Sequence, residues 1–133
     1  TAAGLRLQLF SCEAGGLTYA LAWAHTDPAQ PSESPALLLD RWQQAGWASL
    51  RQTVAEGAPA PAGWSAWPLR MAQAQSLRAW QGPGQDHRGQ ALQARQVYLA
   101  HGGVVYQAAV YGPRLPAEAV APFFEALTLP ARP

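Results

Sequence analysis

Apolar residues recur with a period of two most regularly between Gly89 and Gly112. β-branched and aromatic side chains dominate this stretch, and the segment His101-Gly102-Gly103 divides it into two arms. A period of two is typical of strands, and glycine at a turn can take positive φ without a Cβ clash. The pattern therefore predicts an antiparallel hairpin that forms the centre of the fold.

A second hairpin is expected near the start of the chain. Leu5, Leu7 and Leu9 alternate with other residues, and from Leu17 to Ala24 large side chains alternate with threonine and alanine. The Ala14-Gly15-Gly16 segment between the two arms predicts the turn. The second arm places its large side chains on one face and its small ones on the other, which favours a sheet packed against helices.

One long helix is predicted after Ser34-Pro35, because serine caps a helix N-terminus and proline suits the first helical position. We expect this helix to run to about Ala55. Gly46 falls on its apolar stripe and would let the helix approach the sheet closely, whereas Trp47 falls on the opposite face. The stripe consists of Leu38, Leu39, Trp42, Gly46, Leu50 and Val54.

The remaining segments complete a single domain over residues 1–133. Glu56–Gly63 is a connector rich in proline, alanine and glycine, and Gln75–Trp80 is a short strand. Gln81–Gly89 is interpreted as a turn-rich loop, and Pro116–Leu127 as a last helix. The predicted order is β-β-α-β-β-β-α with mostly antiparallel neighbours, which is typical of an α+β fold.

The second half of the chain resembles a known superfamily. The segments that carry the resemblance are Gly84-Gln85-Asp86, Arg95–Leu99, His101-Gly102-Gly103, Val105-Tyr106-Gln107, Pro113 and Phe123–Leu127. This order of strand, glycine turn, strand and helix is similar to the PsbP-like superfamily, which includes photosystem II accessory proteins, the Ran-binding nuclear import factor, and bacterial envelope and secretion-associated domains. The resemblance implies an α/β/α sandwich, an antiparallel sheet flanked by two helices, and binding without catalysis.

Composition narrows the class of partner. The net charge is +1 and only 13% of residues are charged, against roughly 25% in an average protein, so neither nucleic acid nor an anionic membrane is favoured. No apolar run approaches the ~20 residues that cross a bilayer, so contact with a membrane would be peripheral at most.

The basic residues and the start of the chain bear on origin. All nine basic residues are arginine, and lysine, asparagine and isoleucine are absent, which indicates a GC-rich and bacterial origin. The start at Thr1 fits either the remainder after a removed signal peptide or an arbitrary boundary. A periplasmic or envelope location is favoured over a cytoplasmic one.

Candidate catalytic groups are sparse. Asp86, His87 and Arg88 form the one concentrated polar segment and could meet an anion, but no phosphate-loop pattern is present and a hairpin-entry turn is expected. The three histidines lack the spacing of a zinc motif, and no serine lies in a nucleophile context. We therefore predict no metal, no cofactor and no enzyme activity. The lone Cys12 is interpreted as a small core residue.

The six tryptophans suggest where a partner would bind. Trp47, expected to be exposed beside Arg51, resembles an interface hot spot, with Trp80 and Tyr111 as weaker candidates. The predicted function is a non-catalytic accessory or protein-interaction domain. The alternative is a small-ligand carrier whose pocket lies between the central hairpin, the last helix and an aromatic pair. Its lining residues would be Trp64, Trp67, Tyr98 and Tyr106.

Overall fold

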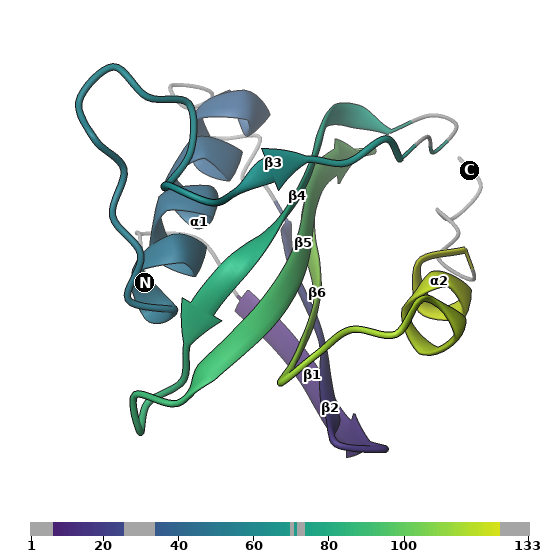
Figure 1. The fold of residues 1–133 in the computed structure, drawn as a ribbon. Coiled ribbons are helices and arrows are strands. Elements are labelled where there is room, and N and C mark those ends of the chain that lie inside the picture. The colour runs from purple at the N-terminus through teal and green to yellow at the C-terminus, as the bar shows by residue number, and fades with distance from the viewer. Residues whose placement is uncertain (1–6, 26–33, 70, 72–73, 126–133) are drawn as a thin grey trace.

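The computed structural model describes residues 7–25, 34–69, 71 and 74–125. They form one six-stranded antiparallel sheet in the order β1-β2-β6-β5-β4-β3, with one helix against each face (Figure 1). The strands are β1 (Leu7–Ala14), β2 (Leu17–His25), β3 (Ser65–Ala66), β4 (Gln75–Gln85), β5 (Ala91–His101) and β6 (Val104–Gly112).

Both predicted hairpins are present. Gly102 and Gly103 have φ angles of 57° and 77° and join β5 to β6, and Gly15 and Gly16, at 59° and 80°, join β1 to β2. Two consecutive residues with positive φ give the turn twist that matches two antiparallel strands. β6 pairs with β2, so the two hairpins lie side by side in one sheet. Strands β6 and β5 therefore occupy the middle of that sheet.

The helix α1 (Pro35–Ser49) begins where the sequence predicts. The Ser34 hydroxyl oxygen accepts a hydrogen bond from the Leu37 backbone N–H at 3.2 Å, and Pro35 occupies the first turn. On the sheet side, Leu38 and Leu39 pack with Tyr98 as part of a buried cluster. The helix ends at Ser49, earlier than predicted, because the chain turns at Leu50 and Arg51 takes a positive φ of 60°.

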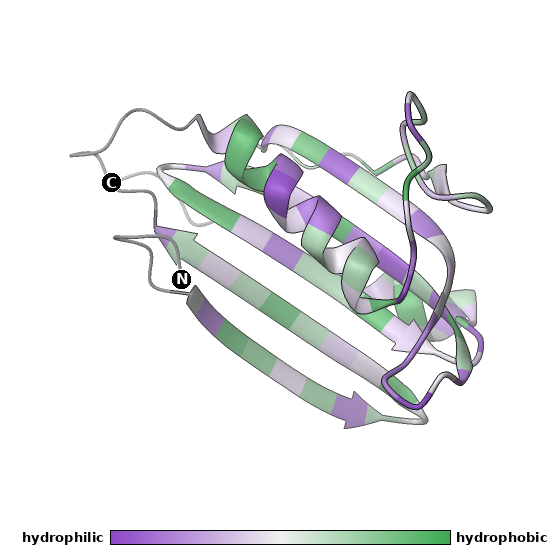
Figure 2. Ribbon diagram, turned by 90° about the vertical axis from the view of Figure 1, so that its left-hand side faces the viewer, coloured by the Kyte–Doolittle hydropathy of each residue, from purple (hydrophilic) through white to green (hydrophobic). Residues whose placement is uncertain are grey.

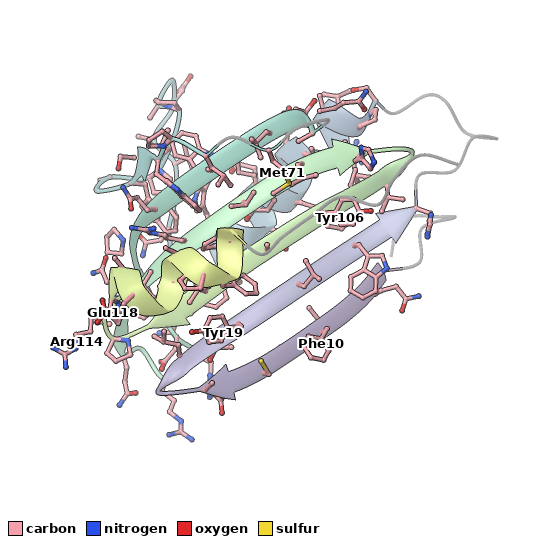
Figure 3. All side chains as sticks on the ribbon, turned by 90° about the vertical axis from the view of Figure 1, so that its right-hand side faces the viewer. Phe10, Tyr19, Met71, Tyr106, Arg114 and Glu118 are labelled. Atoms are coloured by element: carbon pink, nitrogen blue, oxygen red, sulfur yellow. The ribbon has the colours of Figure 1, made fainter. Side chains whose placement is uncertain are left out.

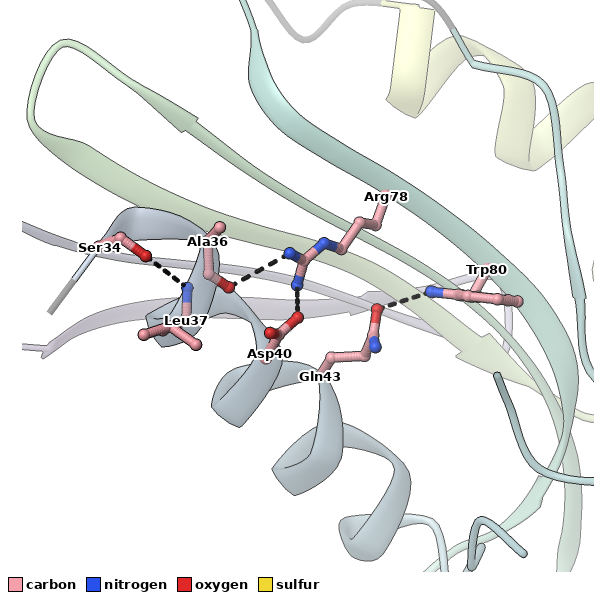
Figure 4. Close-up of polar contacts among 7 residues, drawn as sticks. All are labelled: Ser34, Ala36, Leu37, Asp40, Gln43, Arg78 and Trp80. Atoms are coloured by element: carbon pink, nitrogen blue, oxygen red, sulfur yellow. Dashed lines mark hydrogen bonds and ion pairs between the residues drawn. The ribbon is translucent and has the colours of Figure 1, made fainter. Parts of the chain in front are cut away.

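Polar contacts fix α1 over strand β4 (Figure 4). Arg78 on β4 pairs with the carboxylate of Asp40 and donates a hydrogen bond to the Ala36 carbonyl at 3.2 Å. One turn further along the helix, the Gln43 side-chain oxygen accepts a hydrogen bond of 2.7 Å from the indole N–H of Trp80. Because these contacts all lie on the β4 side of α1, the helix is held toward that side of the sheet.

The second helix, α2 (Ala117–Glu125), packs on the opposite face (Figure 1). Its Val120 and Phe124 are buried against Val97 of β5 and Val110 of β6. The last residues of the predicted helix, up to Leu127, lie outside the described residues. Since α2 has nine residues, it covers only part of this face.

The predicted α/β/α sandwich with two flanking helices is wrong. The molecule is mostly one six-stranded sheet, and its two helices are too short to form complete layers on it. Strand β4 runs on to Gln85 through a segment predicted as a loop, and β3 adds a strand that was not predicted. At the other edge, every residue from Gln8 to Ala14 in β1 is exposed, so neither helix covers this strand.

Candidate functional site

The expected exposure of Trp47 is wrong. Its side chain is only 1% exposed and makes edge contacts with the rings of Trp64 and Trp80, at centroid distances of 6.1 and 5.5 Å. Trp64 is itself buried and donates a hydrogen bond from its indole N–H to the Pro83 carbonyl at 2.8 Å. Trp47 therefore belongs to the hydrophobic core and presents no surface to a partner.

The structure brings Arg51 together with the predicted polar segment. Arg51 donates a hydrogen bond to the His87 carbonyl at 3.0 Å, in the turn that joins β4 to β5. One Asp86 carboxylate oxygen accepts hydrogen bonds from the backbone N–H groups of Gln90 and Arg88, at 2.9 and 2.8 Å. The bond from Gln90 is the main reason that the pKa of Asp86 lies below its ordinary value. These contacts fit a hairpin turn whose aspartate is engaged by its own backbone.

The four aromatic residues predicted to line one pocket lie on opposite faces of the sheet. Tyr98 packs with α1, whereas Tyr106 packs on the α2 side. Trp64 likewise belongs to the cluster around Trp47, while Trp67 contacts Phe124 of α2 at a centroid distance of 5.0 Å. Because the sheet separates Tyr98 and Trp64 from Tyr106 and Trp67, the pocket predicted between the central hairpin and the last helix does not form from these residues.

An apolar groove lies instead between α1 and the β1–β2 edge of the sheet. Figure 2 shows the ribbon of α1 in front of the sheet, with the strands of the β1–β2 edge beside the helix and not beneath it. Its volume is about 400 Å³. We call it the α1 groove. Its floor and walls are formed by Leu9, Ala20, Ala22, Trp42, Ala45, Gly46, Ser49, Gln107 and Tyr111.

The local sequence explains why the groove is open. Positions 20 and 22 of β2 carry alanine, so no large side chain rises from the floor to fill the space on this side of the helix. Across the groove, Ala45 presents only a methyl group from the exposed side of α1. No lining residue carries a formal charge, and Leu9 at the outer rim is 68% exposed. The groove therefore offers apolar surface to solvent without a competing charge.

Two partly buried polar residues, Gln107 and Tyr111, line the β6 wall of the groove and hydrogen-bond to buried partners. The Tyr98 hydroxyl accepts a hydrogen bond of 3.2 Å from Gln107, and the Tyr111 hydroxyl accepts one of 3.4 Å from Gln96. Burial raises the pKa values of both tyrosines, so both phenols are neutral at physiological pH. Tyr111, predicted as a binding residue, does line the groove, whereas Trp80 is partly buried beneath α1.

Strand β1 is an exposed surface that was not predicted from the sequence. Leu9 and Phe10 are adjacent in the strand, point to opposite faces of the sheet, and are 68% and 61% exposed. Figure 3 shows Phe10 on the α2 side, away from Tyr106 near the middle of the sheet. Cys12 was predicted to be a core residue and is exposed. Two adjacent large apolar residues in a strand place one apolar side chain on each face of the sheet. The Leu9-Phe10 pair in the sequence therefore already indicated that both faces of this strand need a partner.

The described residues give no indication of metal chemistry. Within those ranges, no group of three or more histidine, cysteine, aspartate or glutamate side chains could hold a metal ion. Nor is either described helix long and apolar enough to span a membrane.

Comparisons with known proteins find a similar structure but no family. No family model matches the chain, and no curated protein matches it. It is similar to the crystal structure of a protein of unknown function, PA94 from Pseudomonas aeruginosa, described as a putative regulator. The similarity covers 97% of this chain and 85% of that chain, at 15% identity and a TM-score of 0.48. The resemblance to the PsbP-like superfamily stays a prediction from sequence.

Proposed function

We propose that this protein is a non-catalytic protein-interaction domain that binds an apolar segment of a partner protein in the α1 groove. The observation that carries the proposal is an open, uncharged groove of about 400 Å³ beside the exposed side chain of Leu9. Ligand and partner sites are typically concave, mostly apolar, and furnished with a few polar groups. A partner side chain inserted beside Trp42 would gain burial without desolvating a charge.

The groove also supplies a few fixed polar groups for orientation. Gln107 is held by its hydrogen bond to Tyr98, and Ser49 donates a hydrogen bond of 2.7 Å to the Gly46 carbonyl. Binding sites commonly combine apolar walls with a small number of such groups. A partner segment would therefore be placed by shape and apolar contact, with these polar groups along the groove setting its direction.

A small apolar ligand is the second candidate, because about 400 Å³ falls within the usual range of ligand pockets. Such pockets bury most of a ligand surface. The α1 groove is open along its length between Leu9 and Ala45, both of which are exposed. An open groove of this shape suits an extended or bulky partner better than a compact molecule, which favours a protein.

Bacterial origin and an envelope location are separate parts of the proposal. The exclusive use of arginine as the basic residue supports a GC-rich bacterial genome. The envelope location stays a prediction from sequence. Fractionation of the source cells into cytoplasm, periplasm and membrane tests it directly, and recovery in the cytoplasm alone would contradict it.

The groove is best tested with two arginine substitutions on the same helix. Ala45 and Ala48 are both exposed on α1, but only Ala45 lines the groove. Ala45→Arg fills the groove with a charged side chain, whereas Ala48→Arg adds the same side chain outside it. Neither change removes a buried contact, so the free energy of unfolding of each variant should lie within about 0.5 kcal/mol of the wild-type value.

The assay is quantitative affinity capture from source cells with wild-type, Ala45→Arg and Ala48→Arg baits. We expect one protein to be enriched by the wild type and by Ala48→Arg, and to fall at least about tenfold with Ala45→Arg, corresponding to about 1.4 kcal/mol. Equal recovery with all three baits would exclude the groove as the binding site. Enrichment of no protein, with lipid or small molecules retained by the wild type, would support the ligand carrier.

A further inference from the structure

Strand β1 forms the free edge of the sheet, and all its residues from Gln8 to Ala14 are exposed. It pairs with β2 on one side, and no described residue pairs with its other side. A strand in this position presents a row of unpaired backbone N–H and C=O groups.

The hairpin register identifies which backbone groups face outward. Ala14 and Leu17 flank the two-residue turn, so they form a hydrogen-bonded pair, and such pairs alternate along the hairpin. Phe10 and Cys12 therefore use their backbone groups toward β2. The residues whose backbone N–H and C=O groups point away from β2 are Leu7, Leu9, Ser11 and Glu13.

The β1 edge lacks the devices that prevent edge-to-edge pairing. Natural edge strands are usually shortened, bulged, or protected by proline, lysine or an inward-pointing charge. β1 has eight residues in unbroken register with β2, and its sequence LQLFSCEA contains no proline and a single charge, at Glu13. Two large apolar side chains, Leu9 and Phe10, are exposed on its two faces.

We propose that the β1 edge binds the β1 edge of a second copy of this chain, forming a symmetric dimer by antiparallel strand pairing. The twofold axis passes between the two Phe10 residues. In this register Phe10 lies opposite Phe10 of the second copy, Leu9 opposite Ser11, and Gln8 opposite Cys12. Seven residues of each β1, from Leu7 to Glu13, take part.

Contact between the Phe10 rings and pairing length select this register among the symmetric ones. A register centred on Ser11 would place Phe10 opposite Cys12 and separate the two Phe10 rings, and one centred on Leu9 would pair only five residues of each strand. Centring on Phe10 pairs seven and keeps the two Glu13 residues about 20 Å apart along the strands. That separation exceeds the screening length of about 8 Å at physiological salt, and the net charge of +1 per chain adds little repulsion.

The pairing covers exposed apolar surface on both faces. On the α2 side the two Phe10 rings form a non-hydrogen-bonded cross-strand pair, the arrangement in which side chains lie closest. On the α1 side each Leu9 lies diagonally across from its symmetry mate, within reach of a long side chain. The proposal rests on the β1 edge alone and holds whether or not a partner binds in the α1 groove.

Sedimentation velocity of the full chain over a range of concentrations tests dimerisation. We expect the wild type to shift from monomer to dimer as concentration rises. Phe10→Lys should raise the dissociation constant at least tenfold, because it places two like charges opposite each other at the axis. Leu37→Lys is the matched control, since Leu37 is 53% exposed on α1 and should leave the dissociation constant unchanged. A wild type that stays monomeric, or a dimer that both variants leave intact, would overturn the proposal.

Disulfide formation tests the register and does not depend on a charged variant folding. Non-hydrogen-bonded partners have Cα atoms about 4.5 Å apart, within the range that a disulfide spans. Phe10→Cys in a Cys12→Ser background should therefore form a linked dimer under mild oxidation, and so should Gln8→Cys with Cys12 present. Wild-type Cys12 should not link, because its symmetry mate lies about 13 Å along the strands.

The control for non-specific oxidation is Leu37→Cys in the same Cys12→Ser background. Equal linkage of this control and the Phe10→Cys variant would overturn the proposal, as would rapid linkage of wild-type Cys12. If the β1 cysteine formed a disulfide only with a different protein added to the mixture, the edge would belong to that partner, and the proposed dimer would also be overturned. Groove binding is measured separately with Ala45→Arg, so the two proposals can fail independently.

Discussion

Gly46 lies where α1 passes over Tyr98, and Gly46→Ala tests how closely the helix packs on the sheet. A Cβ atom at position 46 would overlap the Tyr98 hydroxyl oxygen and would lie 3.2 Å from the Gln96 side-chain nitrogen. Tyr98 is fully buried and accepts a hydrogen bond from Gln107, so its ring cannot shift without disturbing the core. The added methyl group would therefore force the helix away from the sheet.

Two opposing free energies set the size of the effect. Alanine is favoured over glycine within a helix by about 0.5–1 kcal/mol, whereas overpacking a core costs about 1–3 kcal/mol. We expect Gly46→Ala to lower the free energy of unfolding by about 1–2 kcal/mol. Tyr98→Phe removes the overlapped oxygen at a cost of about 1 kcal/mol for the lost hydrogen bond. In that background Gly46→Ala should be neutral or stabilising by up to about 1 kcal/mol.

Urea unfolding of the wild type, both single variants and the double variant measures the coupling directly. Tryptophan fluorescence reports the transition, since Trp47 follows Gly46 in the same helix. The expected coupling free energy is about 1–3 kcal/mol with a reversal of sign for Gly46→Ala between backgrounds. A Gly46→Ala variant more stable than the wild type, or additivity within about 0.5 kcal/mol, would refute close packing of α1 on Tyr98.

Three further predictions follow from burial and hydrogen bonding. Trp47→Ala should lower the free energy of unfolding by about 3–5 kcal/mol in urea titrations, because a buried ring is lost; a change under about 1 kcal/mol would contradict its core position. Burial raises the pKa values of Tyr98 and Tyr111, so stability should fall as pH rises above about 10, and absorbance titration should show that the phenol of the fully buried Tyr98 ionises only with unfolding. The hydrogen bond from Gln90 lowers the pKa of Asp86, so its stabilising effect is present above about pH 4 and lost as pH falls through the lowered pKa; carboxyl NMR titration checks this, and Asp86→Asn should remove that acid dependence.

Local signals gave correct predictions where a few neighbouring residues decide the conformation. The Gly102-Gly103 turn and the Ser34-Pro35 helix start are both present, because a positive φ and an N-cap hydrogen bond are set within a few residues. Register along both hairpins then follows from the alternating pattern. The fold class was not predicted correctly, because it depends on how far each helix covers the sheet. That coverage is decided by contacts between residues distant in sequence.

The position of Trp47 could not be read from the apolar stripe alone. The buried side of α1 includes Gln43 together with Leu39 and Trp47, so one of its rows contains a polar residue. A stripe drawn only through apolar residues passes through Trp42 instead. The helix orientation predicted from that stripe is therefore rotated relative to the observed one. Gln43 is tolerated there because it accepts a hydrogen bond from Trp80, a contact between residues 37 apart in sequence.

The glycines of β4 led to a wrong prediction of a loop, because their role also depends on distant contacts. Gly82 and Gly84 flank Pro83 and were interpreted as a loop, yet all three pair with β5. A Cβ at position 82 would overlap the ring of Trp64, and one at position 84 would lie 2.9 Å from the Leu50 Cβ. These glycines therefore let Trp64 and Leu50 pack closely on β4, and they do not mark a turn. A lone sequence does not separate the two uses of glycine.

The exposed edge strand links the two proposals physically. β1 contributes Leu9 to the rim of the α1 groove through its side chain, and it offers its outward backbone groups to a second copy. Side chain and backbone point in perpendicular directions in a strand, so one residue can serve both without conflict. Pairing of two β1 edges would place two grooves on the same face of one continuous sheet. A partner with two apolar segments would then bind with higher avidity than either groove provides alone, and Phe10→Lys should lower that avidity while leaving the affinity of a single groove unchanged.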